Sequence, residues 1–311
     1  MSFSTQVKKE LCKIKPDASC CMNAEVYGLL LFAKSFHQDS IFITAENHWL
    51  LEMISEFLAI STGAVTQIEM RLSLSGRKNS VASVTIPDKG DRIKVLSLFG
   101  HDPEKIPTIQ LHNFKEEECR ASFFRGAFLV CGLISDPNKE YRLEFVISKK
   151  ALAEEFSSLL ASIALFTLHP KITKRNTAFV VYLKESEQIA DFLVYIGAKN
   201  AAMELMQVKM VKEVRNYINR TTNFQTANLS KTAVAAADQM SDILFIKQTK
   251  GLEFLPKELS ELAKLRLKHP ELSLKELGQS LEKPISRSGV NHRLKKIKEI
   301  AVELRSAVGG R

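Results

Sequence analysis

The sequence of 311 residues has few cysteines and no long apolar run. The cysteines are odd in number and contain no CxxC pair: Cys12, Cys20, Cys21, Cys119 and Cys131. This pattern argues against a disulfide framework and against a zinc site, so we expect reduced thiols in a cytoplasmic protein. Because no run of about 18 apolar residues is present, we expect no membrane partner. The N-terminal residues also lack the apolar core of a secretion signal.

Patterns typical of nucleotide, cofactor and metal sites are missing as well. No Walker loop and no GxGxxG motif precedes a predicted helix. The seven histidines are scattered and show no spacing suited to metal ligands. The sequence therefore predicts neither a cofactor nor a bound metal.

Positive charge gathers toward the C-terminus. From residue 256 onward there are 13 Lys/Arg against 7 Asp/Glu, a net charge of +6 out of a total of +9. Such asymmetry is expected when the partner is a polyanion, because neutralising phosphates releases counterions. The charge distribution therefore favours a nucleic acid as the partner of the C-terminal end.

Two short helices are predicted in this basic end. Ser273 and Glu276 have the spacing of a capping box, which starts a helix. Pro284 blocks its continuation, and Ser286 can cap a second helix after a turn over 282–285. Two helices joined in this way are typical of a helix-turn-helix.

The second helix has an apolar face and a polar, basic face. Its apolar residues recur every three or four positions: Val290, Leu294, Ile297, Ala301 and Leu304. The residues that we expect to contact DNA are Ser273, Lys275, Ser286, Arg287, Ser288, Asn291, His292, Arg293, Lys295, Lys296 and Lys298. Arg, Lys and Asn suit base edges, whereas further Lys and Arg suit phosphates. The alternative is a solvated helix pair, but the cap, the breaker, the apolar stripe and the basic face occur together, which favours DNA binding.

The first 200 residues repeat one order of elements around two glycines, Gly28 and Gly126, 98 residues apart. In the first copy we expect a helix over 24–35, a strand over 40–46, a helix over 47–60, strands over 65–72 and 81–86 joined through 76–79, and a helix over 88–99. In the second we expect a helix over 123–135, a strand over 141–147, a helix over 150–168, a hairpin of 170–175 and 177–183, and a helix over 184–196. The repeat indicates an internal duplication and a pseudo-twofold α+β domain with the two glycine helices side by side.

A helical connector is expected between the duplicated domain and the basic end. It should contain one helix over 203–219 and another over 229–246. Lys209, Lys212 and Arg215 recur every three residues on the first of these. This stripe could contact a phosphate backbone, or it could only be solvated; the sequence favours neither.

The duplicated glycine helices resemble those of the LAGLIDADG homing endonucleases. VYGLLLFAK (26–34) and FRGAFLVCG (124–132) align with the nine-residue motif when the glycines are matched. The eighth position, which holds the catalytic acid in that family, is Ala33 in the first copy and Cys131 in the second. Without carboxylates there, metal-dependent hydrolysis has no ligands for its ion.

The whole chain is similar to the bacterial WhiA family. The connector sequence VRNYINRTTNFQTANL and the C-terminal SRSGVNHRLKKI carry the resemblance. It implies four parts: an N-terminal helix and basic loop (1–21), a degenerate LAGLIDADG-like domain (22–198, repeats about 22–100 and 116–198), the connector (199–255) and an all-α helix-turn-helix domain (256–311). It also implies a regulator with roles in transcription, cell division, chromosome segregation and, in spore formers, sporulation.

Three functions are weighed on this basis. The first is a DNA-binding regulator without enzyme activity, located at the nucleoid. The N-terminal domain of such a regulator could recruit RNA polymerase or another transcription factor. The second is an active endonuclease, whose nearest acids would be Asp39 and Asp136. The third is an adaptor whose N-terminal domain binds a protein or a small molecule.

Overall fold

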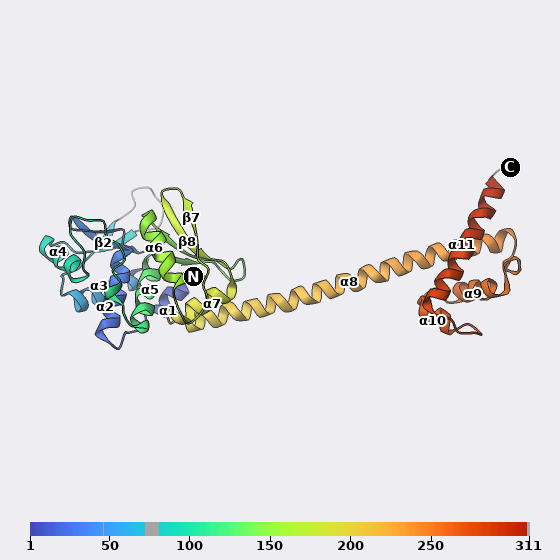
Figure 1. Ribbon diagram of the computed structural model, residues 1–311, viewed down its shortest axis with the longest axis horizontal. Coiled ribbons are helices and arrows are strands. Elements are labelled where there is room, and N and C mark those ends of the chain that lie inside the picture. The colour runs from blue at the N-terminus through green and yellow to red at the C-terminus, as the bar shows by residue number, and fades with distance from the viewer. Residues whose placement is uncertain (46, 72–80, 310–311) are drawn as a thin grey trace. The chain divides into compact units, whose positions relative to one another are not determined.

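The computed structural model describes residues 1–45, 47–71 and 81–309. They form two units, Met1–Glu213 and Val214–Arg311 (Figure 1). The predicted connection through 76–79, and the last residues of the predicted strands 40–46 and 65–72, lie outside the described residues.

The first unit contains the predicted duplication. Its first copy comprises α2 (Ser19–Leu31), β1 (Ser35–His37), β2 (Ser40–Ala45), α3 (His48–Thr62), β3 (Gln67–Arg71), β4 (Val81–Thr85) and α4 (Lys89–Leu98). Its second copy comprises α5 (Glu117–Cys131), β5 (Gly132–Ile134), β6 (Leu143–Ile147), α6 (Lys150–Ala161), β7 (Lys171–Arg175), β8 (Ala178–Leu183) and α7 (Ser186–Tyr195), after a short 3-10 turn, η1 (Leu111–Asn113). The two antiparallel sheets have the equivalent orders β1-β2-β4-β3 and β5-β6-β8-β7. The predicted duplicated α+β fold is therefore confirmed.

Two short strands were not predicted. The helices expected over 24–35 and 123–135 end at Leu31 and Cys131, and the residues that follow enter β1 and β5. Phe36 pairs with Ile41 across the β1–β2 hairpin, and Gly132 pairs with Phe145 across β5 and β6. A continuous apolar run does not distinguish a buried helix from the buried strand after it, which explains the error. The helix expected over 150–168 also ends early, at Ala161.

The two glycines allow α2 and α5 to cross with their backbones in contact (Figure 1). A Cβ atom added to Gly28 would lie 2.2 Å from the carbonyl oxygen of Phe123. A Cβ atom added to Gly126 would lie 2.1 Å from that of Glu25. Each glycine faces the equivalent part of the other helix, and the equivalent residues Cys21 and Cys119 also meet about two turns earlier, so the helices run parallel. No larger residue fits at either crossing position.

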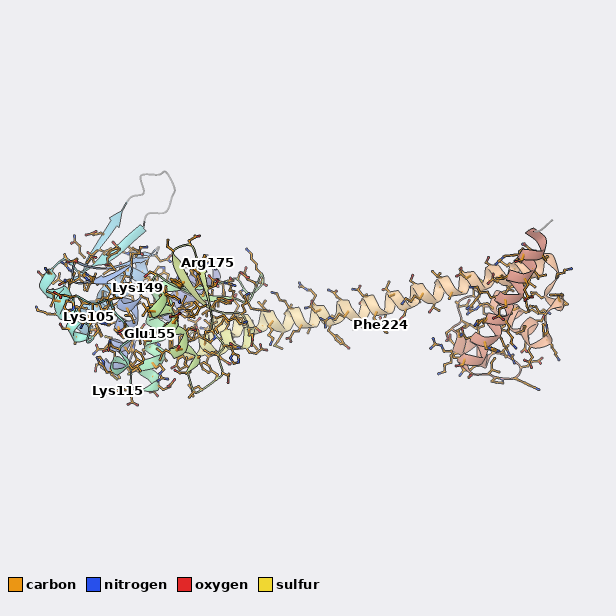
Figure 2. The ribbon with its side chains drawn as sticks, turned by 45° about the horizontal axis from the view of Figure 1, so that its top comes forward. Lys105, Lys115, Lys149, Glu155, Arg175 and Phe224 are labelled. Carbon is orange, nitrogen blue, oxygen red and sulfur yellow. The ribbon has the colours of Figure 1, made fainter. Side chains whose placement is uncertain are left out.

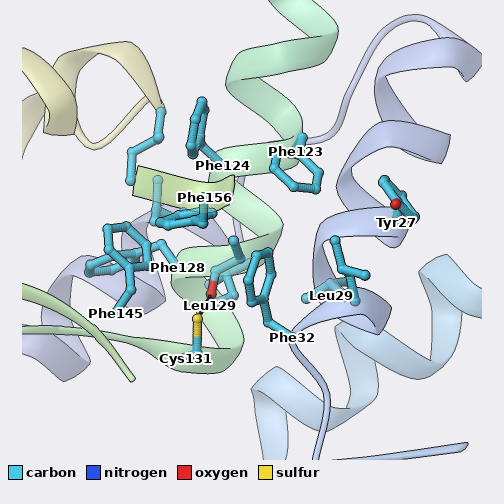
Figure 3. Close-up of a cluster of buried hydrophobic side chains, with 14 of the residues drawn as sticks. Tyr27, Leu29, Phe32, Phe123, Phe124, Phe128, Leu129, Cys131, Phe145 and Phe156 are labelled. Carbon is cyan, nitrogen blue, oxygen red and sulfur yellow. Dashed lines mark hydrogen bonds between the residues drawn. The ribbon is translucent and has the colours of Figure 1, made fainter. Parts of the chain in front are cut away.

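An aromatic core surrounds this crossing. Phe123, Phe124, Phe128, Phe145 and Phe156 are fully or almost fully buried and come from α5, β6 and α6 (Figure 3). The ring centroids of Phe145 and Phe156 are 4.7 Å apart. Aromatic contacts of this kind add to the free energy gained from burying apolar area.

Helix α1 (Phe3–Leu11) packs on the same unit. Phe3, Val7 and Leu11 are buried, which matches the helix predicted there. The Glu10 carboxylate accepts hydrogen bonds from the backbone N–H groups of Asn200 and Ala201, at 2.8 and 3.1 Å. The N-terminal helix thereby caps the first turn of the next long helix.

The connector is one helix, α8 (Lys199–Thr249), and not the two helices predicted. Residues 219–229 include several weak helix formers, but no glycine or proline occurs from 198 to 250. Propensity differences of a few tenths of a kcal/mol per residue do not interrupt a helix by themselves. The absence of a breaker was the stronger signal.

The second unit continues from α8 into η2 (Leu252–Phe254), α9 (Lys257–Lys268), α10 (Leu274–Gln279) and α11 (Arg287–Gly309). Its own apolar core includes Ile243, Leu262, Leu277, Val290 and Ile297. Among the helices that the structure describes, none is both long and apolar enough to cross a membrane.

Candidate nucleic-acid interface

The first helix of the predicted pair begins at its expected cap. The Ser273 hydroxyl accepts a hydrogen bond from the Glu276 N–H at 3.3 Å, and a Glu276 carboxylate oxygen accepts one from the Ser273 N–H at 2.8 Å. These bonds hold the pKa of Glu276 below its usual range. This capping box satisfies two backbone donors at the start of α10, so the predicted start is confirmed.

The loop before α10 is held from inside the unit. Arg266, in the last turn of α9, is buried with 2% of its surface exposed. Its guanidinium donates hydrogen bonds to the carbonyl oxygens of Leu272, at 2.7 Å, and Pro270, at 3.3 Å. This side chain therefore fixes the approach to the Ser273 cap, a role that the sequence did not predict.

Helix α11 begins at the second predicted cap. The Ser286 hydroxyl accepts a hydrogen bond from the Gly289 N–H at 3.2 Å. The predicted inward residues Val290, Leu294, Ile297 and Ala301 are all buried, and Leu304 is half-buried. Burial of this stripe fixes the rotation of α11 about its axis, and with it the face that remains exposed.

A glycine sets the distance between α10 and α11. A Cβ atom added to Gly278 would lie 2.4 Å from the Ile285 carbonyl oxygen and 3.0 Å from a methyl carbon of Val290. The Ile285 N–H donates a hydrogen bond to the Gly278 carbonyl oxygen at 3.0 Å. Gly278 therefore permits the close turn between the two helices. A glycine inside a predicted helix was the available signal for this role, and the sequence reasoning passed over it.

The opposite face of α11 is exposed as predicted. Arg287, Ser288, Asn291, His292, Lys295, Lys296 and Lys298 are all exposed. Arg287, Asn291, Lys295 and Lys298 follow spacings of four, four and three residues, so they form one stripe along the helix. Within 1–45, 47–71 and 81–309, none of the stripe's cationic side chains forms an ion pair. The stripe can therefore meet a polyanion without first breaking an internal contact.

Arg293 differs from the other predicted contacts. Its guanidinium lies 2.8 Å from the Glu258 carboxylate, and its side chain is only 19% exposed. The ion pair joins α11 to the start of α9. This ion pair favours a structural role for Arg293. Lys275, in α10, is exposed, and its contact with DNA stays a prediction.

Two of the three predicted phosphate contacts on α8 have partners in the first unit. Lys209 forms ion pairs with Glu187 and Glu213. The Lys212 ammonium donates a hydrogen bond to the Pro137 carbonyl oxygen at 2.7 Å and lies 4.8 Å from the centre of the Tyr141 ring. These contacts favour a structural role for both lysines.

Arg215 lies on the same stripe of α8 but is exposed. It belongs to the second unit, whereas Lys209 and Lys212 belong to the first. A phosphate contact by Arg215 stays a prediction.

The ends of the motif helices α2 and α5 form a separate candidate site. A cavity of about 350 Å³ is lined there by residues that include Ala33 and Cys131. The described residues that line it include no Asp or Glu. Cys131 donates a hydrogen bond to the Ala127 carbonyl oxygen, and burial raises the pKa of its thiol to about 12. Its described lining thus lacks the carboxylates that usually hold Mg²⁺ in a protein.

The nearest predicted acids also lie away from this cavity lining. Asp39 is exposed and lies 3.1 Å from a His37 ring nitrogen. Asp136 is half-buried, and hydrogen bonds from Asn138 hold the pKa of its carboxyl below the usual range. Each carboxylate therefore contacts a residue two positions away in the chain.

The structure also brings together three thiols that the sequence did not group. Cys20, Cys21 and Cys119 lie with their sulfur atoms within 4.8 Å of one another. The first two lie in α2 and the third in α5, at the end of these helices opposite Ala33 and Cys131. Spacing rules failed here because the fold brings together residues about a hundred positions apart.

Comparison with known proteins matches both units. The profile of the "WhiA C-terminal HTH domain" matches residues 218–301, and that of the "WhiA LAGLIDADG-like domain" matches residues 120–215. A protein of Clostridium botulinum named "Probable cell division protein WhiA" is 40% identical over 320 aligned residues, which cover 99% of this chain and 100% of that protein. A protein of the same name from Ruminiclostridium cellulolyticum is 39% identical over 313 residues, which cover 98% of each chain.

A solved structure shares the fold. The structure described as "full-length DUF199/WhiA from Thermatoga maritima" superposes with a TM-score of 0.59 at 23% sequence identity, and the match covers 97% of this chain and 99% of that one. The sequence matches extend over nearly the whole length of the chain. The chain therefore belongs to the WhiA family.

Proposed function

We propose that this protein is a sequence-preferring, non-enzymatic regulator that binds double-stranded DNA through α11. The exposed stripe of Arg287, Asn291, Lys295 and Lys298 carries this proposal. It lies on a helix whose start and rotation are set by a cap and a buried apolar face. A helix presented in this way can enter the major groove, where Arg and Asn distinguish guanine from adenine.

The biological role follows the names of its relatives. The curated proteins are named as probable cell division proteins, and we propose a role in cell division for this chain. The resemblance to the family supports transcription regulation, chromosome segregation and, in a spore former, sporulation, together with a location at the nucleoid. Genome-wide crosslinking tests this proposal: binding at promoters supports transcription control, whereas dispersed sites support a chromosomal role.

The absence of nuclease activity is part of the proposal. Its support is the cavity beside Ala33 and Cys131, whose described lining has no carboxylate. Incubation of the protein with supercoiled DNA and Mg²⁺ should leave the DNA intact. Nicked product that disappears in Asp136→Ala would contradict this part and restore the endonuclease interpretation.

Salt dependence tests whether phosphates are contacted at all. We expect the logarithm of the affinity for a genomic fragment to fall linearly with the logarithm of the salt concentration, with a slope of about −0.9 for each phosphate neutralised. The measurement is a fluorescence-anisotropy titration of full-length protein at several salt concentrations. Affinity that does not change with salt would exclude this mode of binding.

The reading face is tested by the double variant Arg287→Ala/Asn291→Ala. Each base contact that is lost should weaken binding to the preferred sequence by about 1–3 kcal/mol and relax sequence preference. Lys105→Ala is a suitable control, because this exposed lysine lies in the first unit and, among the described residues, its one ion pair is with Asp102 (Figure 2). If the double variant keeps its sequence preference, the assignment of the reading face is wrong.

A protein partner is the second candidate function. Tyr217 and Phe224, on α8, are 72% and 69% exposed, which is unusual for aromatic side chains. Figure 2 shows the Phe224 side chain on this helix. RNA polymerase or another transcription factor would be a suitable partner for a DNA-bound regulator. A photo-crosslinking residue placed at position 224 should then form an adduct with polymerase in cells. An adduct only with DNA would argue against this partner.

A further inference from the structure

Three thiols meet at the N-terminal end of the crossed helices. Cys20 and Cys21 lie in the first turn of α2, and Cys119 lies in the first turn of α5. The sulfur atoms of Cys21 and Cys119 are 3.5 Å apart, and all three sulfur atoms lie within 4.8 Å of one another. Cys119 is buried, Cys21 is half-buried and Cys20 is exposed. The cluster is therefore packed on one side and open to solvent on the other.

The internal duplication explains why two of these thiols meet. Cys21 and Cys119 are 98 residues apart, the same offset as Gly28 and Gly126. Because the helices run parallel and cross at the glycines, equivalent residues on the inner faces approach each other across the pseudo-twofold axis. Cys20, next in the chain, adds a third sulfur from the same helix turn.

The surroundings suit an ion held by thiolates. Neither α2 nor α5 has a side-chain cap at its N-terminus, so N–H groups of the first turn keep unpaired positive ends near the sulfur atoms. The helix dipoles also favour negative charge there, although Glu117 and Glu118 in the first turn of α5 already supply some. Burial raises the pKa of the Cys119 thiol, so the metal ion itself must displace that proton. A tetrahedral zinc site with Zn–S bonds of about 2.3 Å places its sulfur atoms about 3.8 Å apart. The observed separation is 3.5 Å for Cys21 and Cys119 and at most 4.8 Å for the other pairs, so the sulfur atoms already lie near this spacing.

We propose that Cys20, Cys21 and Cys119 bind a thiophilic closed-shell metal ion, with Zn²⁺ as the ion. Each thiol releases its proton to water as its sulfur–metal bond forms, so neither an oxidant nor a reductant is needed. Water occupies the fourth position on the exposed side, next to Cys20. The ion would join the N-terminal ends of the two pseudo-symmetric helices. This site is independent of the DNA-binding face on α11.

A disulfide between Cys21 and Cys119 is the competing chemistry. It requires an oxidant and a sulfur–sulfur distance of about 2.05 Å, and it gives no role to Cys20. The presence of a third thiol within reach of both sulfur atoms favours the metal ion.

Cobalt provides the spectroscopic test. Full-length protein is reduced, treated with a chelator and titrated with Co²⁺ without oxygen. We expect one ion per chain, a sulfur-to-cobalt charge-transfer band, the visible bands of a tetrahedral ion, and loss of both on addition of Zn²⁺. Native mass spectrometry of the zinc-loaded protein should show one Zn²⁺.

Single variants identify the ligands. Cys20→Ser and Cys119→Ser should each weaken Zn²⁺ binding by more than the about 10- to 100-fold that loss of an outer-shell contact costs. Cys12→Ser is the matched control, because that half-buried thiol lies outside the cluster, and it should bind as the parent does. Cys20 is exposed, so its variant tests the site even if Cys119→Ser does not fold.

Three results would overturn the proposal. The first is the absence of a tetrahedral cobalt spectrum in the reduced parent protein. The second is Zn²⁺ affinity unchanged by Cys20→Ser. The third is a Cys21–Cys119 disulfide found by mass spectrometry in protein isolated and alkylated without oxygen, with no metal bound.

Discussion

The two units use glycine for the same purpose but differ in what remains on their surfaces. In the first unit, Gly28 and Gly126 bring two helices into backbone contact, and in the second Gly278 lets α10 lie against the Ile285 carbonyl oxygen in the turn before α11. Beside the first crossing, the expected acid positions hold Ala33 and Cys131. In the second unit, the buried apolar face and the exposed polar stripe lie on the same helix, α11. In both units the residues that set the packing of the helices differ from the residues that their surfaces present to a ligand.

The largest effect should come from breaking the buried ion pair of the first unit. Arg125 donates hydrogen bonds to the Glu25 carboxylate at 2.7 and 2.9 Å, and both side chains are buried. Arg125→Met leaves that carboxylate without its partner and should lower the free energy of unfolding by about 3–5 kcal/mol. Urea unfolding provides the measurement.

Arg175→Met is the matched control for that variant. Arg175 also pairs with a carboxylate, Glu144, but its side chain is 51% exposed and Arg142 remains as a second partner. The expected loss is below about 1 kcal/mol. If the two variants lost the same amount of unfolding free energy, burial would not explain how much the Arg125–Glu25 pair contributes to stability.

The helix crossing should be the next most sensitive point. In Gly126→Ala the new methyl group overlaps the Glu25 carbonyl oxygen, so the helices must separate. We expect a loss of about 3 kcal/mol in unfolding free energy. Gly90→Ala is the control, because its Cβ atom meets only a side-chain oxygen of Asp88, at 3.0 Å, and its effect should stay within about 0.5 kcal/mol. If Gly126→Ala lowered the unfolding free energy no more than Gly90→Ala does, the close contact between the helices would be refuted.

The equivalent change in the second unit connects packing to DNA binding. Gly278→Ala places a methyl group against the Ile285 carbonyl oxygen and should cost about 2 kcal/mol while weakening DNA binding. Gly289→Ala is the control, since its Cβ atom makes only ordinary contacts with Ile285 at 3.4 Å, and it should stabilise α11 by up to about 1 kcal/mol. Anisotropy titration and thermal unfolding measure both effects. If Gly278→Ala kept the DNA affinity of the parent, DNA binding would not depend on how closely α10 packs against α11.

The smallest effect should come from the capping box. Ser273→Ala removes a cap of α10 and should cost about 1 kcal/mol. Because the folded-state pKa of Glu276 is depressed, its contribution is present above the usual carboxyl pKa and is lost as the pH falls through the folded-state pKa. Unfolding of the parent and of Glu276→Gln should therefore differ near neutral pH and converge in acid. If the parent and Glu276→Gln still differed in unfolding free energy in acid, the ionised Glu276 carboxylate would not be the source of that difference.

Local signals in the sequence predicted the second unit well. The Ser273 and Ser286 caps, the inward stripe and the exposed stripe of α11 depend on residues within one or two turns of each other. The duplication was also visible, because both copies repeat the same order of elements. The least accurate predictions concerned where an apolar helix ends and a short strand begins, since periodicity does not mark that change.

Other features depended on distant contacts. The sequence did not show that Arg293 is paired with Glu258, nor that Lys209 and Lys212 hold α8 to the first unit. The thiol cluster was missed because its members lie far apart in the chain. One signal could have revealed it, namely that Cys21 and Cys119 have the same offset as the two crossing glycines.

The sequence alone determined the duplicated α+β order, the caps of the last helices and the two faces of α11. It did so because these features depend on hydrogen bonds and periodicity between near neighbours. Only the tertiary structure decided which cations remain exposed, which residues line the cavity beside the helix ends, and which thiols meet. Those outcomes depend on the crossing of α2 with α5 and on contacts between helices, where residues far apart in the chain come within a few ångströms.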